Sequence, residues 1–163
     1  MNAAVAWSTL LVILVAVYIT WTAGRLDRMH ARVDAAWAAL DAQLVRRAFA
    51  AQALLPQLPA GAARERLAVA ASAVAEAGEE DRERVENDLS RALQEALPML
   101  PAEGQARAEL EAAAARVALA RSFHNSAVHD TRALRRRKVP RLLRLAGHRS
   151  MPAFFDVDDT VLT

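Results

Sequence analysis

Residues 3–23 read AAVAWSTLLVILVAVYITWTA and contain no charged side chain. A helix of this length, rising 1.5 Å per residue, spans about 30 Å, the thickness of a bilayer's hydrocarbon core. Trp7, Tyr18 and Trp21 lie toward the two ends of the run, where amphipathic rings favour the membrane interface. The pattern therefore predicts one transmembrane helix, which forms an anchor over residues 1–24.

Two other interpretations of this segment stay open. A cleaved signal peptide would need a basic stretch before the apolar run, but only the terminal amine precedes it, and residues 23–24 make a poor cleavage site. A buried helix of a soluble protein would need a polar face, and only Ser8, Thr9, Thr20 and Thr22 supply one. The length and the flanking residues favour the anchor.

The charges beside the apolar run predict its orientation. Arg25, Arg28 and Arg32 follow the run directly, and no charged side chain precedes it. The positive-inside rule then places residues 25–163 in the cytoplasm. We therefore expect a single-pass protein of the cell (inner) membrane with a cytoplasmic C-terminal domain.

The composition of the remaining chain is typical of a helical protein. All 21 basic and 19 acidic residues lie beyond residue 24, among many alanines and with only 5 Gly and 6 Pro in the whole chain. Alanine is the best helix former because it loses no side-chain entropy on folding. Such a composition favours a helical bundle or coiled coil. The chain has no Cys, which excludes disulfides and thiolate metal sites.

The spacing of apolar residues predicts four helices after the anchor. The first carries one stripe at steps of three and four and ends before Pro56. The other three cover about residues 62–77, 79–97 and 103–138, and Pro140 ends the last. The stripe of the first helix consists of Leu26, Met29, Val33, Trp37, Leu40 and Leu44.

The turns between these helices are short, so neighbouring helices should be antiparallel. The predicted fold class is all-α: a single N-terminal transmembrane helix followed by an antiparallel four-helix bundle. The bundle domain covers residues 25–139, and residues 140–163 form a C-terminal tail. Because the helices alternate in direction, the end of the fourth should lie near the bilayer again.

The same geometry predicts the register of the first and fourth helices. A rise of 1.5 Å per residue puts Trp37 level with residues 123–126 and Asp41 level with Arg121. We therefore predict an ion pair between Asp41 and Arg121.

Two stretches of the chain resemble the signatures of the LemA family: AAWAALDAQLVRR at residues 35–47 and ALARSFHNSAV at residues 118–128. Smaller similarities follow at residues 139–140, 145–147 and 154–156. The resemblance implies a bacterial single-pass membrane protein with a four-helix bundle and no established enzymatic activity. The chain differs from the family pattern at residues 49–53 and at His124.

A set of polar and aromatic residues within these two stretches forms the first candidate site. One interpretation is that they pack between helices and fix the register of the bundle. The other is that they form an exposed recognition patch. The residues are Trp37, Asp41, Gln43, Arg46, Arg47, Arg121 and Asn125.

A basic tract forms the second candidate site. Its cations suit three roles: a solvated helix C-terminus, a nucleic-acid patch, or a surface that meets anionic lipid headgroups. The predicted return of the fourth helix to the bilayer favours the headgroups, and the lack of interleaved aromatic residues argues against nucleic acid. The tract consists of Arg132, Arg135, Arg136, Arg137, Lys138, Arg141 and Arg144.

The C-terminal sequence Phe154-Phe155-Asp156-Val157-Asp158-Asp159 resembles the first motif of haloacid dehalogenase-type phosphatases. That chemistry needs a sheet and further acidic residues, and no such domain follows in this chain. His124 and His129 are five residues apart, which does not suit two ligands on one helix face. We therefore expect no enzyme, no cofactor and no metal.

The sequence is best interpreted as that of a structural or adaptor protein that binds another protein, also in the membrane. The alternative is a membrane-surface organiser that contacts anionic lipid headgroups through the basic tract. The expected partners are membrane lipid and another membrane protein, with association between copies of the chain as a further option. Nucleic acid is not an expected partner.

Overall fold

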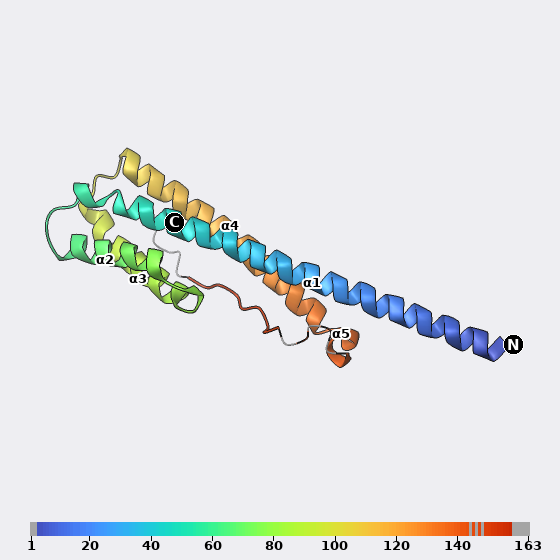
Figure 1. Ribbon diagram of the computed structural model, residues 1–163. Coiled ribbons are helices and arrows are strands. Elements are labelled where there is room, and N and C mark those ends of the chain that lie inside the picture. The colour runs from blue at the N-terminus through green and yellow to red at the C-terminus, as the bar shows by residue number, and fades with distance from the viewer. Residues whose placement is uncertain (1–2, 144, 146, 148, 158–163) are drawn as a thin grey trace. The chain divides into compact units, whose positions relative to one another are not determined.

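A computed structural model describes residues 3–143, 145, 147 and 149–157 of the chain. Within these residues, all regular secondary structure is helical (Figure 1). These residues form five α-helices, and a short 3-10 turn stands between each pair of consecutive helices from α1 to α4. The elements are α1 (Ala3–Gln52), η1 (Leu55–Gln57), α2 (Ala62–Glu76), η2 (Glu79–Asp81), α3 (Arg82–Ala96), η3 (Leu97–Met99), α4 (Gln105–Arg135) and α5 (Lys138–Leu142).

Helix α1 joins the apolar run and the first amphipathic stripe into one helix. Its N-terminal part is long and apolar enough to cross a membrane, and the most apolar stretch has no buried residue. A signal sequence near the N-terminus can meet the same criteria of length and composition. At the end of this part, the guanidinium of Arg25 lies 5.8 Å from the ring centroid of Trp21, a cation–π contact.

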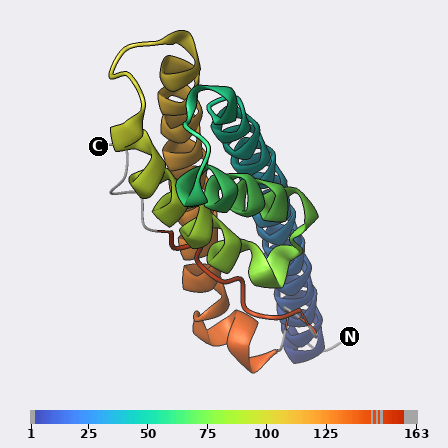
Figure 2. The ribbon, with the colours of Figure 1, turned by 90° about the vertical axis from the view of Figure 1, so that its left-hand side faces the viewer.

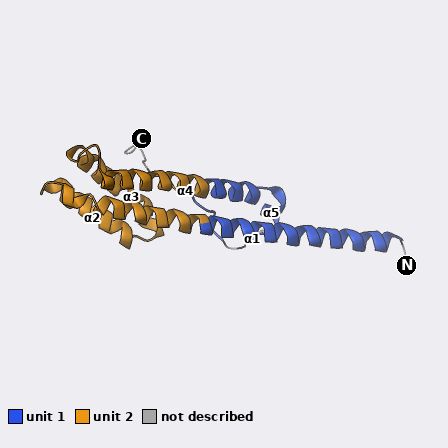
Figure 3. Ribbon diagram, turned by 90° about the horizontal axis from the view of Figure 1, so that it is seen from above, with its two compact units in different colours: residues 1–35, 126–153 blue, residues 36–125, 154–163 orange. Residues whose placement is uncertain are grey.

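The helices α1 and α4 each contribute to two compact units, coloured separately in Figure 3. Unit 1 contains residues 1–35 and 126–153, and unit 2 contains residues 36–125 and 154–163. The predicted tail at residues 140–163 is therefore shared between the two units.

The main apolar core lies in unit 2. Helices α2 and α3 pack closely against each other, side by side in Figure 2. Their inward faces meet the end of α1 and the start of α4, so four helices contribute to one cluster. The fully buried leucines of this cluster are Leu54, Leu67, Leu89, Leu93 and Leu110.

The predicted helices are present, with shifts at their ends. The helix predicted at 62–77 is α2, and the one predicted at 79–97 begins with the 3-10 turn η2 before α3. The prediction that Pro140 ends the fourth helix is wrong. Helix α4 ends at Arg135, and Pro140 lies in the first turn of α5, where the missing N–H has no helical partner to lose.

Candidate interaction sites

In unit 1, the end of α4 contacts the part of α1 that follows the apolar run. The hydroxyl of Thr131 lies 3.4 Å from the carbonyl oxygen of Met29, and a guanidinium nitrogen of Arg135 lies 3.4 Å from Nε2 of His30. The C-terminal end of α4 therefore lies against this part of α1. A buried stripe on α1 accompanies these contacts, formed by Thr22, Leu26, His30 and Val33.

Arg135 also holds the chain that follows α5. Its guanidinium donates hydrogen bonds to the carbonyl oxygens of Ser150 and Arg149, the latter at 2.9 Å. Arg149 in turn lies 3.8 Å from the carboxylate of Asp34, and both side chains are exposed. One basic residue of the predicted tract is thus engaged within unit 1 and does not face solvent freely.

His30 is buried and bonded on both ring nitrogens. Nδ1 lies 2.9 Å from the carbonyl oxygen of Leu26, and Nε2 faces Arg135. A carbonyl oxygen can only accept and a guanidinium can only donate, so this pattern fits the tautomer that carries its proton on Nδ1.

The rest of the basic tract is divided by the break between α4 and α5. Arg132 is half-buried, whereas the four cations that follow Arg135 are exposed. The end of helix α5 adds apolar surface to them, because Leu142, its last residue, is 83% exposed and Leu143, which follows it, is 43% exposed. Arg144 lies outside the described residues. The exposed cations are Arg136, Arg137, Lys138 and Arg141.

In unit 2, Asp41 pairs with a residue that the sequence did not single out. Its carboxylate lies 2.5 Å from the guanidinium of Arg82, which also donates to the carbonyl oxygen of Val74. The predicted pair of Asp41 with Arg121 is wrong, because Arg121 instead donates to the carbonyl oxygen of Val157 at 2.7 Å. The prediction considered only partners on α4, whereas the first residue of α3, Arg82, reaches the side of α1 that carries Asp41.

Arg47 forms a second polar link between α1 and α3. It donates a 2.6 Å hydrogen bond to the hydroxyl of Ser90 and lies 3.7 Å from the carboxylate of Glu86. Arg47 and Glu86 are almost completely buried. The sequence offered one signal for Glu86, since an acid one turn before the buried Leu89 must face the core.

The aromatic ring of Trp37 joins α1, α4 and the C-terminal segment. It lies 5.5 Å from the rings of His124 and Phe155, edge-on to both. The contact with His124 confirms the predicted level of Trp37. The side chain of Asn125 bonds the backbone of Phe155 on both sides, at 3.0 Å and 2.9 Å.

Two members of the predicted set lie apart from these contacts. Arg46 is exposed, and Gln43 is half-buried. On α4, the sequence did not single out an exposed apolar pair one turn apart: Leu119 is 58% exposed and Phe123 is 62% exposed. Their spacing of four residues on a helix with many exposed positions is the signal that could have found them.

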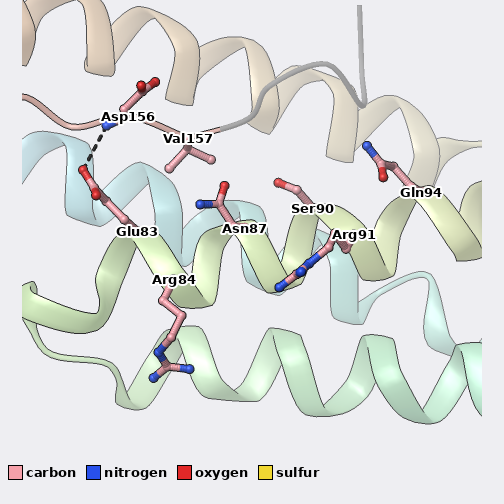
Figure 4. A pocket seen from close by; sticks show the side chains of 8 residues that line it. All are labelled: Glu83, Arg84, Asn87, Ser90, Arg91, Gln94, Asp156 and Val157. Carbon is pink, nitrogen blue, oxygen red and sulfur yellow. Dashed lines mark hydrogen bonds between the residues drawn. The ribbon is translucent and has the colours of Figure 1, made fainter.

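An open groove of about 940 Å³ runs along α3 (Figure 4). Asp156 and Val157 close one side of it, and the backbone N–H of Asp156 donates a 3.0 Å hydrogen bond to Glu83. The wall is polar. The residues that line the groove from α3 are Glu83, Arg84, Asn87, Ser90, Arg91 and Gln94.

Among the described residues, no three His, Asp or Glu side chains come together in a way that could hold a metal ion. Of the phosphatase-like motif, Asp156 is exposed at the edge of the groove. Asp158 and Asp159 lie outside the described residues.

No family model matches the chain, and no curated protein and no solved structure matches it either. Membership of the LemA family therefore stays a prediction that rests on residues 35–47 and 118–128.

Proposed function

We propose that this chain is a non-enzymatic, single-pass membrane protein that holds its helical domain against an anionic membrane surface. The apolar part of α1 acts as the anchor, the chain beyond it lies in the cytoplasm, and the basic residues around α5 bind lipid headgroups. The observation that carries the proposal is the exposure of Leu142, at the end of α5, and of Leu143 directly after it, next to the exposed cations Lys138 and Arg141 of the same short helix.

Contacts within each unit support the antiparallel four-helix bundle that belongs to this proposal. In unit 1, Thr131 meets Met29, and in unit 2, His124 meets Trp37. Within unit 2 alone, Trp37 meets His124 and Ala51 shares an apolar cluster with Leu110, so residue numbers on α4 fall as those on α1 rise, as expected for two antiparallel helices. In both Figures 1 and 3, α5 lies beside the part of α1 that belongs to unit 1.

The chemistry of α5 suits a membrane surface better than bulk water. Each cation close to an anionic surface contributes about 1 kcal/mol. An exposed leucine that enters the headgroup region gains part of the roughly 1.5–3 kcal/mol of complete burial. The anchor supplies proximity, so these modest energies suffice to orient the domain.

A fluorescent probe on α5 tests the proposal. The chain has no Cys, so Leu142→Cys accepts a single environment-sensitive fluorophore. In vesicles that contain phosphatidylserine, its emission should shift to the blue and spin-labelled lipid should quench it. Salt should weaken both effects, because headgroup attraction is screened beyond about 8–10 Å at physiological ionic strength.

Two comparisons make this experiment specific. The same probe at Val69→Cys, which is equally accessible on α2, should show neither effect. Replacing the four exposed cations of the tract together by Gln should remove the preference for anionic lipid. A Leu142 probe that stays in water in every vesicle would contradict the proposal.

The exposed pair Leu119 and Phe123 supports a second candidate function, an adaptor that binds another membrane protein. Large apolar and aromatic side chains at the surface are typical centres of protein interfaces. A photocrosslinking amino acid at Phe123 should give one discrete adduct in native membranes, and the same amino acid at Val69 should not. A smear of products from both positions would count against the adaptor.

A further inference from the structure

The C-terminal segment, residues 154–157, is bound in unit 2 as an extended chain. Its side chains alternate: Phe155 and Val157 are 3% and 4% exposed, whereas Phe154 is 44% exposed and Asp156 faces outward. This period of two is that of a β-strand, although the segment has no strand beside it among the described residues.

The two inward side chains enter an apolar site built by α1 and α4. The ring of Phe155 meets Trp37 edge-on, a geometry that aromatic pairs prefer. The site holds the alternate residues Phe155 and Val157, and Asp156 between them faces outward. The residues of the site are Trp37, Leu40, Leu44, Val117 and Ala120.

Side chains from α3 and α4 bind the backbone of the segment. Asn125 both donates to the carbonyl and accepts from the N–H of Phe155, as a neighbouring strand would. Arg121 donates to the carbonyl of Val157, and Glu83 accepts from the N–H of Asp156 (Figure 4). Main-chain hydrogen bonds with pockets for alternate side chains are how extended peptides are recognised in many complexes.

We propose that this site is a receptor for an extended segment of the pattern aromatic–any–aliphatic, and that the C-terminal segment of a second copy of this chain can occupy it. The sequence that fits the site is this chain's own. None of the contacts depends on the connection between the segment and the rest of the chain, so an equal segment from a neighbour makes them all.

The connection leaves room for such an exchange. Between α5 and the segment, the described residues form turns and irregular chain, and Arg135 and Asp34 hold this linker at Arg149 and Ser150. Residues 143–153 extend to about 36–40 Å once those exposed contacts open. Copies anchored in one membrane meet at a high effective concentration, which favours exchange of identical elements.

Two complementary variants test the exchange in the full-length protein. In the first, Asn125→Leu damages the receptor and leaves the segment intact. In the second, Phe155→Ser with Val157→Ser damages the segment and leaves the receptor intact. Each carries a fluorophore at Val69→Cys for energy transfer in lipid vesicles. The mixture should associate at least about tenfold more strongly than either variant alone.

A peptide control identifies the contact. The peptide PAFFDV, residues 152–157, should abolish energy transfer in the mixture, and PAFSDS should not. The matched variant Phe154→Ser changes only the outward ring, so its own segment should still fill its own site. Mixed with the Asn125→Leu variant in place of the segment-deficient chain, it should give no gain in energy transfer. A mixture that transfers no more energy than its components, with native helicity in both, overturns the proposal.

A measurement on the otherwise native chain covers the case in which a damaged segment unfolds the protein. A photocrosslinking amino acid at Phe154 should give a covalent dimer that disappears when excess PAFFDV is added. Products confined to a single chain at high protein density in the membrane would overturn the exchange.

Discussion

Units 1 and 2 both bury polar side chains, but they satisfy them differently. In unit 1, Thr22, His30 and Thr131 bond the carbonyl oxygen of the residue four positions earlier in their own helix. The contacts of His30 and Thr131 with the other helix are longer, at 3.4 Å. In unit 2, the buried Arg47 and Arg82 reach from one helix to another. A bond within one helix satisfies a buried group without fixing that helix against its neighbour, whereas a bond between helices does both.

The apolar contacts show the same contrast. Both clusters of buried apolar residues that the described chain forms belong to unit 2. In unit 1, the long apolar part of α1 stays uncovered. We infer that unit 2 is stabilised by its own core and cross-links. Unit 1 buries fewer apolar side chains, among them Leu26, Val128 and Leu134, and depends more on its surroundings. Four predictions, from the largest expected effect to the smallest, test this contrast.

The largest effect is expected in the apolar core of unit 2. Leu89→Ala removes a completely buried side chain and should lower the free energy of unfolding by about 2–5 kcal/mol. Urea unfolding of the full chain in detergent, followed by circular dichroism, measures it. The matched variant Leu119→Ala, at an exposed position, should change it by about 0.5 kcal/mol or less.

The buried pair of Arg47 and Glu86 should give the next effect. Arg47→Met leaves the Glu86 carboxylate in the core without this cation and should cost about 3 kcal/mol. The double variant Arg47→Met with Glu86→Met should recover most of the loss, because a buried ion pair replaced by apolar residues is often neutral. Arg46→Met, next in sequence but exposed, is the control; a similar loss there would contradict this explanation.

Sequence patterns were enough to predict the helices and which part of α4 lies opposite Trp37 of α1. The stripe from Leu26 to Leu44 follows helical periodicity, and Trp37 lies against His124 as helix rise requires. The partner of Asp41 was not predictable in this way. The rise per residue gives the position of Asp41 along the axes of α1 and α4, but it does not show whether a third helix lies nearer to Asp41. Its partner Arg82 is the first residue of α3 and follows the turn η2.

Residues 154–157 belong to the predicted C-terminal tail, because Pro140 is predicted to end the last helix. Phe155 and Val157 nevertheless alternate with exposed residues, which is the signal of a half-buried extended chain. Its binding site is assembled from residues 30 or more positions away, such as Glu83, Arg121 and Asn125. No local pattern in the segment identifies those partners.

The corrected pair of Asp41 and Arg82 should give a moderate effect. A double-mutant cycle with Asp41→Ala and Arg82→Ala should show a coupling free energy of about 1–2 kcal/mol, because Asp41 is partly exposed to water. The same cycle with Asp41→Ala and Arg121→Ala should be additive. Coupling in the second cycle and none in the first would restore the register predicted from helix rise.

The smallest effect is expected for the ion pair of Asp34 and Arg149 in unit 1. The two groups are 3.8 Å apart, and more than half of each side chain is exposed. Water screens such a pair, and holding two long side chains in place costs entropy, so Asp34→Ala should change the free energy of unfolding by about 0–1 kcal/mol. Arg135→Gln should cost more, because this residue bonds two carbonyl groups of the linker as well as facing His30. Hydrogen exchange in the full chain separates the two variants: Arg135→Gln should raise exchange at Met151 and Ala153, and Asp34→Ala should leave it unchanged. If both variants destabilise the protein equally, the exposed ion pair contributes more than its geometry allows, and unit 1 would be cross-linked in the same way as unit 2.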